Sequence, residues 1–182
     1  LAYKFGAPDF GSGAWLTFGR LRPIHTNATF YGFASIALVG LAYYVAVRSC
    51  GTRLYSARLA WIGLILFNVA AVAGTAALDM GYNAGDLEYR EWPWPIRVIF
   101  LAALLVTACN LIGSVARRHT EDIYLSNWYT IGGVLWTCII AIVAILPWYQ
   151  HGLGQVSVSG YYMHNAVGMW FTPLALGIFY YA

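Results

Sequence analysis

The sequence predicts an all-α membrane protein whose helices cross the bilayer several times. Of its 182 residues, 60% are hydrophobic and only 9% are charged. A soluble domain carries about 25% charged residues, so this chain has too few to cover a water-facing surface. Five uncharged stretches are long enough for the roughly 20 residues that a ~30 Å hydrocarbon core requires. They lack the alternating hydrophobicity of membrane strands, and we therefore expect helices, whose backbone groups are hydrogen-bonded internally.

Each predicted span is bounded by charged or helix-starting residues. The spans are, in chain order, 26–47, 59–78, 98–116, 123–148 and 160–182. Arg48 follows the first span, and Arg58 and Asp79 flank the second. Pro93 and Pro95, in EWPWP, mark the entry to the third, since proline is favoured in the first turn of a helix. The fourth follows Asp122, and the fifth runs to the end of the sequence.

Five spans place the loops on two sides of the membrane. Side A holds the N-terminal stretch and the 79–97 and 149–159 loops, and side B holds the 48–58 and 117–122 loops. Each side carries five Lys or Arg residues, so the positive-inside count is equal. Side B is placed in the cytoplasm because its arginines lie in short loops near span ends. The sequence begins as if within a loop, which indicates a piece of a longer polypeptide.

Other functional classes are less favoured. The formal charge of +3 is small and no basic run indicates binding to nucleic acid. The three cysteines are scattered and predict neither a metal site nor a disulfide framework. No symmetric pair of spans is broken by Gly and Pro, as a transporter would require.

Two of the four histidines are candidates for metal binding. His119 and His151 lie in loops, whereas His25 stands at the predicted mouth of the first span. His164, in YYMHNAVGMWF, lies about one turn into the last span, at the same side-A end. A histidine buried in a membrane indicates a functional site by default. Each could be a hydrogen-bonded packing residue, but two at one level favour a metal or haem site.

Four segments resemble one family. GRLRPIHTNATFYGF resembles the opening of the second transmembrane helix in the catalytic subunit of cbb(3)-type cytochrome c oxidases, the C family of haem-copper oxidases. EYREWPWPI resembles that family's loop between helices III and IV, SVARRHTEDIYLSNWY its IV–V junction, and MHNAVGMWFTPLALGIFYY its helix VI. Their order and spacing agree, so residues 1–182 resemble one partial domain, helices II to VI of a twelve-helix bundle.

The resemblance implies roles for individual residues. His25 would be an axial ligand of the low-spin haem b, and His164 a ligand of the copper ion CuB, which faces a high-spin haem. Arg20 and Arg22 would pair with haem propionates through bidentate hydrogen bonds. Met163 stands where the family has a glycine.

Two acids on side A match a cation site of the family. Glu88 and Glu91 resemble its paired acids near the haem propionates and a calcium ion. Three residues apart, they could share one cation if the turn between them is helical. Carboxylate oxygens suit calcium.

A polar line on the last span is a candidate proton route. Thr172 and Tyr180 follow His164 at intervals of eight residues. In a uniform α-helix eight residues advance ~12 Å and rotate about 80° beyond whole turns, so the three side chains would drift slowly along one face. The resemblance places the family's proton channel along this helix.

The function implied by the resemblance is reduction of O₂ to water with electrons from cytochrome c, coupled to proton translocation. The expected location is the bacterial inner membrane, with the haem-side loops toward the periplasm. The expected partners are other oxidase subunits, including membrane-anchored cytochromes c. The alternatives are a nitric oxide reductase-like subunit with non-haem iron in place of copper, and a non-catalytic haem-binding accessory subunit.

Overall fold

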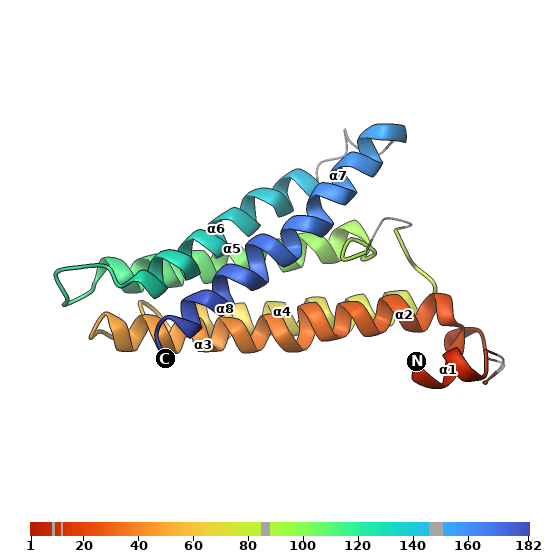
Figure 1. Cartoon of the computed structure of the whole chain (residues 1–182), viewed down its shortest axis with the longest axis horizontal. Coiled ribbons are helices and arrows are strands. Elements are labelled where there is room, and N and C mark those ends of the chain that lie inside the picture. Colours follow the sequence, from red (N-terminus) through yellow and green to blue (C-terminus); the bar gives the residue numbers. More distant parts are fainter. Residues whose placement is uncertain (9, 12, 85–87, 146–150) are drawn as a thin grey trace.

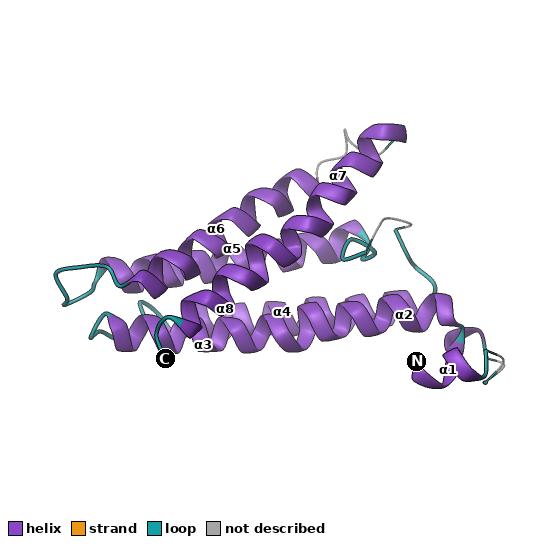
Figure 2. Cartoon of the chain, viewed as in Figure 1, coloured by secondary structure: helices purple, strands orange, loops and turns teal. Residues whose placement is uncertain are grey.

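The computed structural model describes residues 1–8, 10–11, 13–84, 88–145 and 151–182. Every regular element in these ranges is helical (Figure 2). The elements are α1 (Ala2–Gly6), the 3₁₀ turn η1 (Ala14–Leu16), α2 (Phe18–Asn27), the π-helical η2 (Ala28–Ala34), α3 (Ser35–Ser49), α4 (Ala57–Asp79), α5 (Trp94–Ala116), α6 (Leu125–Ile145), α7 (Gly152–Asn165), the π-helical η4 (Ala166–Phe171) and α8 (Thr172–Phe179).

The helices run roughly along the long axis of the molecule as an elongated bundle (Figure 1). Elements α2, η2 and α3 join into one continuous rod, and α7, η4 and α8 form a second rod that crosses the bundle. Within the described ranges, four helices are long and apolar enough to cross a membrane: Phe18–Ser49, Ala57–Asp79, Trp94–Ala116 and Leu125–Ile145. The predicted helical membrane bundle is therefore confirmed.

The last rod differs from its predicted form. The 149–159 segment was expected to be a loop, but α7 begins at Gly152, and residues 146–150 lie outside the described residues. The sequence from Gly152 to Ser159 has no proline and no charge, so nothing in it stops a helix. His164 is therefore twelve residues, about 18 Å, from the start of its helix rather than one turn.

The first rod also starts earlier than expected. Helix α2 begins at Phe18, so His25 lies seven residues inside it and not at its mouth. The predicted span was limited to uncharged residues, which excluded Arg20 and Arg22. Both arginines are nevertheless helical, because their long side chains reach partners outside the helix: Arg20 bonds to the Asp79 carbonyl and Arg22 pairs with Glu88.

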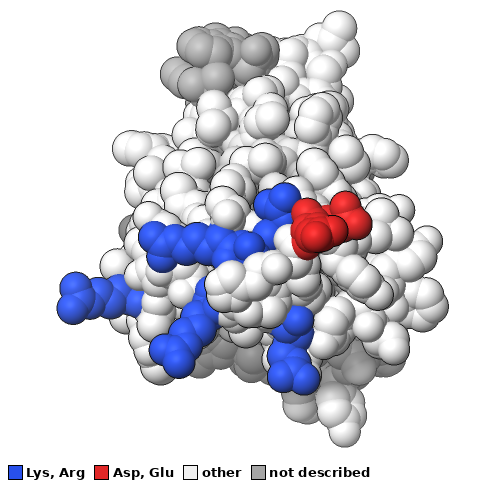
Figure 3. Space-filling view, turned by 90° about the vertical axis from the view of Figure 1, so that its left-hand side faces the viewer, with Lys and Arg blue, Asp and Glu red and all other residues white. Residues whose placement is uncertain are grey.

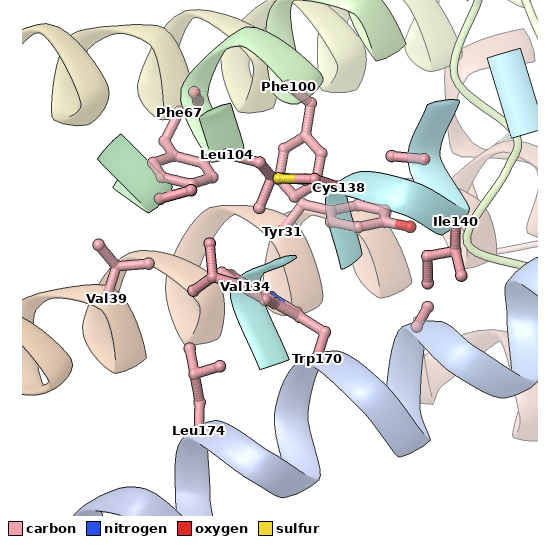
Figure 4. Packing of buried hydrophobic residues seen from close by; sticks show 14 of the residues in the cluster. Tyr31, Val39, Phe67, Phe100, Leu104, Val134, Cys138, Ile140, Trp170 and Leu174 are labelled. Carbon is pink, nitrogen blue, oxygen red and sulfur yellow. The ribbon is translucent and has the colours of Figure 1, made fainter. Parts of the chain in front are cut away.

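An aromatic cluster forms the centre of the bundle (Figure 4). The Tyr31 ring of η2 meets the Phe100 ring of α5 edge-on, with centroids 4.8 Å apart, and Phe67 of α4 meets Phe100 at 5.4 Å. Trp170 of η4 is 1% exposed and closes the cluster from the other side. Lipid is as apolar as these side chains, so close packing stabilises helix association in a membrane.

Helices α6 and α8 approach closely at a glycine. A Cβ atom at Gly133 would lie 3.0 Å from Pro173 Cβ and 3.3 Å from the Met169 carbonyl oxygen. Small residues at such crossings let backbones come together in membrane bundles. This contact fixes the last rod against α6.

Candidate metal centre

His25 and His164 lie on different rods but occupy equivalent positions on them. The buried stripe of α2 and η2 is Pro23, Asn27 and Tyr31, and the buried stripe of α7 and η4 is Tyr162, Ala166 and Trp170. Each histidine is two residues, about 200°, from a member of its stripe, so each ring points away from the bundle core. Both side chains are exposed in this chain.

The expectation that His164 is buried among apolar neighbours is therefore wrong for this chain, since the buried face of α7 is the opposite one. Neither His25 nor His164 forms a hydrogen bond with any residue that the structure describes. By contrast, His119 Nδ1 lies 2.9 Å from the Gly51 carbonyl oxygen at the other end of the bundle, and His151 precedes the first residue of α7. Helices α2 and α7 lie in the same half of the molecule (Figure 1). Both candidate imidazoles thus have free ring nitrogens, which a metal-ligand role requires.

A π-helical segment follows each of the two histidines: η2 begins three residues after His25, and η4 begins two residues after His164. The second has a clear cause in Pro173, which has no N–H and would clash with the carbonyl four residues earlier. That carbonyl belongs to Met169, and the Thr137 hydroxyl reaches it at 3.4 Å. Wide turns of this kind are frequent at functional sites.

The two π-helical segments pack against each other. The rings of Phe30 and Phe171 stack with centroids 4.0 Å apart. The Trp170 indole Nε1 donates to Ser35 Oγ at 2.9 Å, and that hydroxyl donates to the Phe30 carbonyl at 2.8 Å. Ser35 and Trp170 are both buried. These contacts fix the rod that carries His25 against the rod that carries His164.

A polar cleft of about 460 Å³, here called the acid cleft, opens beside the His25 helix. It is lined by Phe18, Gly19, Arg22, Pro23, Asn83, Glu88, Glu91 and Met163. Arg22 Nη2 and Glu88 Oε1 are 2.6 Å apart. Met163, which stands where the family has a glycine, therefore lies on the wall of the acid cleft, as do the two predicted calcium ligands, Glu88 and Glu91.

Glu91 is the buried acid of the cleft. Asn27 Nδ2 donates to Glu91 Oε2 at 3.0 Å, and Asn27 Oδ1 is buried without a hydrogen-bond partner among the described residues. Burial raises the pKa of the Glu91 carboxyl, while the bond from Asn27 acts in the opposite direction. A raised pKa favours the protonated form in the folded chain, so the stability that Glu91 contributes is lost as the pH rises through that pKa.

The turn between Glu88 and Glu91 is not the helical turn through which their spacing would let them share one cation. Tyr89, between the acids, has φ 68°, which is incompatible with a helix. Glu88 and Glu91 both line the acid cleft, although they do not share a helix face. Their carboxylates and the free Asn27 Oδ1 are hard oxygen donors of the kind that calcium takes. The residues present therefore fit a calcium ion.

Arg20 attaches α2 to the last residue of α4, and Arg22 attaches it to the segment after α4. Arg20 Nη1 donates to the Asp79 carbonyl at 2.7 Å, while Arg22 pairs with Glu88. A guanidinium has five N–H donors, and each arginine uses only part of them here. Both can therefore bind a further anion.

Two buried groups near the site were not identified from the sequence. Arg90 is 1% exposed; its Nη2 donates to the Ala144 carbonyl and its Nη1 to Ser159 Oγ, both at 2.7 Å. It joins the acid cleft to the end of α6 and to α7. The hydroxyls of Tyr31 and Tyr162 lie 3.1 Å apart. No local sequence pattern predicts these contacts. An arginine between two acids in a loop is common, and so are tyrosines among other aromatic residues on a helix.

The predicted proton line is interrupted by η4. The three side chains would drift slowly along one face only if the helix from His164 to Tyr180 were uniformly α-helical. This prediction is wrong, because residues 166–171 are π-helical. Thr172 Oγ1 donates to the Val167 carbonyl at 3.2 Å, and the Tyr180 ring stacks on Tyr129 with centroids 5.5 Å apart. His164, Thr172 and Tyr180 are all exposed on the last rod.

Comparisons with known proteins identify the family. The sequence profile of cytochrome c and quinol oxidase polypeptide I matches residues 1–182. The chain belongs to this family. It is 32% identical over 176 residues to the cbb3-type cytochrome c oxidase subunit CcoN1 of Stutzerimonas stutzeri. The matched region covers 92% of the chain and 37% of that protein.

Two further relatives have related names. The chain is 27% identical to a cytochrome c oxidase subunit 1 homolog of Agrobacterium tumefaciens and 28% identical to cytochrome c oxidase subunit 1 of Rhodobacter capsulatus, each over the full chain. The chain spans 35% and 37% of their lengths, so it covers about a third of the curated relatives that it matches. The family resemblance inferred from the sequence is confirmed, and members of this family bind haem and copper.

The contact between the two rods leads to a stability prediction. Ser35→Ala removes the acceptor of the Trp170 indole and leaves a buried N–H unpaired, which should cost about 1–3 kcal/mol. Ser157→Ala is the matched control, because Ser157 is an exposed helical serine on α7. Thermal unfolding of the complete subunit in detergent measures both. Equal stability of the Ser35→Ala variant and the parent would contradict the role given to this bond.

Proposed function

We propose that this chain is the part of a terminal oxidase catalytic subunit that supplies one ligand of a low-spin haem and one ligand of copper. The complete subunit would reduce O₂ to water with electrons from cytochrome c and couple this reaction to proton translocation. One observation carries the proposal: two exposed histidines, with no hydrogen bond to any described residue, stand two residues from the buried stripes of two rods that are fixed together. Family membership supports the metals assigned to them.

His25 is proposed as an axial ligand of the haem b iron. Its ring is exposed on α2, and Arg22 lies three residues before it, close enough to act on the same bound group. Arg20 and Arg22 keep free N–H groups, so they can orient haem propionates by charge-assisted hydrogen bonds.

His164 is proposed as one ligand of CuB beside a high-spin haem. Among the described residues, no three His, Cys, Asp or Glu side chains come together to hold a metal ion, so the other ligands must be supplied from elsewhere. When bound, the haems and copper would transfer electrons to O₂. The residues of this chain would hold the metals in place and carry protons toward them.

Replacement of the two histidines separates their roles. His25→Ala in the complete subunit should remove the low-spin haem signal from reduced-minus-oxidised spectra. His164→Ala should lower copper content and abolish O₂ reduction while the low-spin haem stays. His119→Ala is the control, since His119 is bonded to Gly51 at the other end. An unchanged low-spin signal in the first variant, or stoichiometric copper in the second, overturns the assignment concerned.

The alternative reaction, nitric oxide reduction at non-haem iron, needs an additional glutamate near the metal. The sequence from 123 to 182 has no acidic residue, so this chain supplies none on its last two helices. Metal analysis of the complete subunit distinguishes the two reactions, since copper supports the oxidase and iron in its place supports the reductase. A non-catalytic haem-binding accessory subunit would contain haem without copper.

We further propose that the acid cleft binds calcium through Glu88 and Glu91. Glu91→Gln keeps an oxygen that can accept the Asn27 bond but removes the charge, so calcium content per haem should fall severalfold. Glu121→Gln, on the exposed 117–122 loop, is the matched control. Elemental analysis after dialysis against a chelator measures both variants. Calcium that stays at the parent level in Glu91→Gln is evidence against the site.

Thr172 and Tyr180 are proposed to carry protons from side B toward the metal site. Hydroxyls both donate and accept hydrogen bonds, and both side chains are exposed on the rod that bears His164. Thr172→Val and Tyr180→Phe should lower turnover severalfold with haem and copper content unchanged, because each change removes only a hydroxyl function. Tyr82→Phe, on the 79–93 loop, is the control. Full turnover in both test variants excludes this route.

The proposed location is the bacterial inner membrane, with the His25 end of the bundle toward the periplasm. The two ends carry equal numbers of Lys and Arg residues, but the arginines of the opposite end lie in short loops near span ends, which supports this orientation. The proposed partners are other oxidase subunits, including membrane-anchored cytochromes c that deliver electrons.

A further inference from the structure

A narrow apolar slot lies between α3 and α4, far from the acid cleft. It has a volume of about 280 Å³. Ile36 and Gly40 line it from α3, and Ala57, Gly63 and Phe67 line it from α4. Its lining is apolar apart from the hydroxyls of Tyr43 and Thr107 and the indole N–H of Trp61, and the Thr107 hydroxyl donates to the Ala103 carbonyl of its own helix. The slot therefore suits a hydrocarbon rather than a polar ligand.

The slot has the length of one membrane leaflet. Its lining on α4 extends from Ala57, the first residue of the helix, to Phe67, and these ten residues span about 15 Å. The hydrocarbon core is ~30 Å thick, so the slot reaches from the side-B surface to about the middle of the bilayer. Trp61 on its wall is 66% exposed, so the slot opens on the outer face of this chain.

Basic residues adjoin the mouth of the slot in the sequence. Leu54 and Ala57 line the mouth, and their sequence neighbours Arg53 and Arg58 are exposed. Figure 3 views this end of the molecule, where basic side chains spread across the surface and the acids form one small group. The charged residues of the two side-B loops and their flanks are Arg48, Arg53, Arg58, Arg117, Arg118, Glu121 and Asp122. Five cations against two acids attract anionic lipid headgroups.

The mouth is already ordered in this chain. The Tyr55 N–H donates to Ser114 Oγ and the Ser56 N–H to Asn110 Oδ1, both at 2.9 Å. Ser56 also caps α4 by accepting from the Leu59 N–H at 3.2 Å. A preformed mouth lowers the ordering cost of binding. The positive end of the α4 dipole adds to the attraction for an anion there.

We propose that the α3–α4 slot binds one acyl chain of an anionic phospholipid, with its phosphate at Arg53 and Arg58. The leaflet-length apolar slot holds the chain, and the arginines beside its mouth select the headgroup. This site is independent of the metals and of the reaction assigned above.

Photolabelling of the complete subunit tests the site. The subunit is placed in nanodiscs that contain phosphatidylglycerol or phosphatidylcholine with a photoactivatable group on the acyl chain, and labelled peptides are identified by mass spectrometry. Phosphatidylglycerol should label residues 36–43 or 57–67 severalfold more than phosphatidylcholine. Arg53→Gln and Arg58→Gln should each lower this labelling about fivefold, the effect of one cation on an anionic headgroup.

Two glycines provide a test variant and a matched control for binding of the acyl chain. A Cβ atom at Gly40 meets nothing within 4 Å, so a side chain at this position starts in open space, and Gly40→Leu should occupy part of the slot and lower labelling severalfold. Gly132 on α6 is equally open and exposed but lies outside the slot, so Gly132→Leu should leave labelling unchanged. If Gly40→Leu prevents assembly, the arginine variants decide alone. The proposal is overturned if the parent is not labelled in the slot, if both lipids label it equally, or if the variants change nothing.

Discussion

The contact between the two π-helical segments is the constraint on which the rest of the site depends. Helix α2 and helix α7 carry the candidate ligands, and the Phe30–Phe171 stack and the Trp170–Ser35 hydrogen bond join their rods, together with the Tyr31–Tyr162 contact. These contacts set the positions of the two imidazoles relative to each other. The wide turn of η4 originates in the sequence itself, because Pro173 cannot donate to the Met169 carbonyl.

Polar contacts at the side-A end add to the aromatic contact in holding the helices that carry the two histidines. Arg20 and Arg22 attach the His25 helix to the end of α4 and to the loop that follows it, and Arg90 joins this loop to α6 and α7. Each ionic group buried here is expensive in a low-dielectric interior unless it is bonded. Arg90 meets that condition through Ala144 and Ser159. The protein thus holds the surroundings of both histidines with charged groups, although it has few of them.

The fold class could be predicted from the sequence because spans in a membrane are defined by composition, and the prolines of EWPWP marked the start of α5 correctly. The extents of the first and last rods could not. Charge does not mark the boundary of the first rod, because Arg20 and Arg22 are helical, and the uncharged Gly- and Ser-containing segment before His164 is a helix although its composition suits a loop. The π-helical turns were also missed, since Pro173 predicts a disturbance but not its form. The pairing of Asn27 with Glu91 depends on tertiary contacts that local patterns do not encode.

The central proposal for this chain is that both exposed imidazoles face bound metals. A cryo-electron microscopy structure of the complete oxidase tests this proposal most directly. We expect an imidazole nitrogen of His25 bonded to a haem iron, one of His164 bonded to copper, and the Phe30–Phe171 and Ser35–Trp170 contacts as in this chain. A structure in which either ring packs against protein or lipid, with the metals held by other residues, would contradict it.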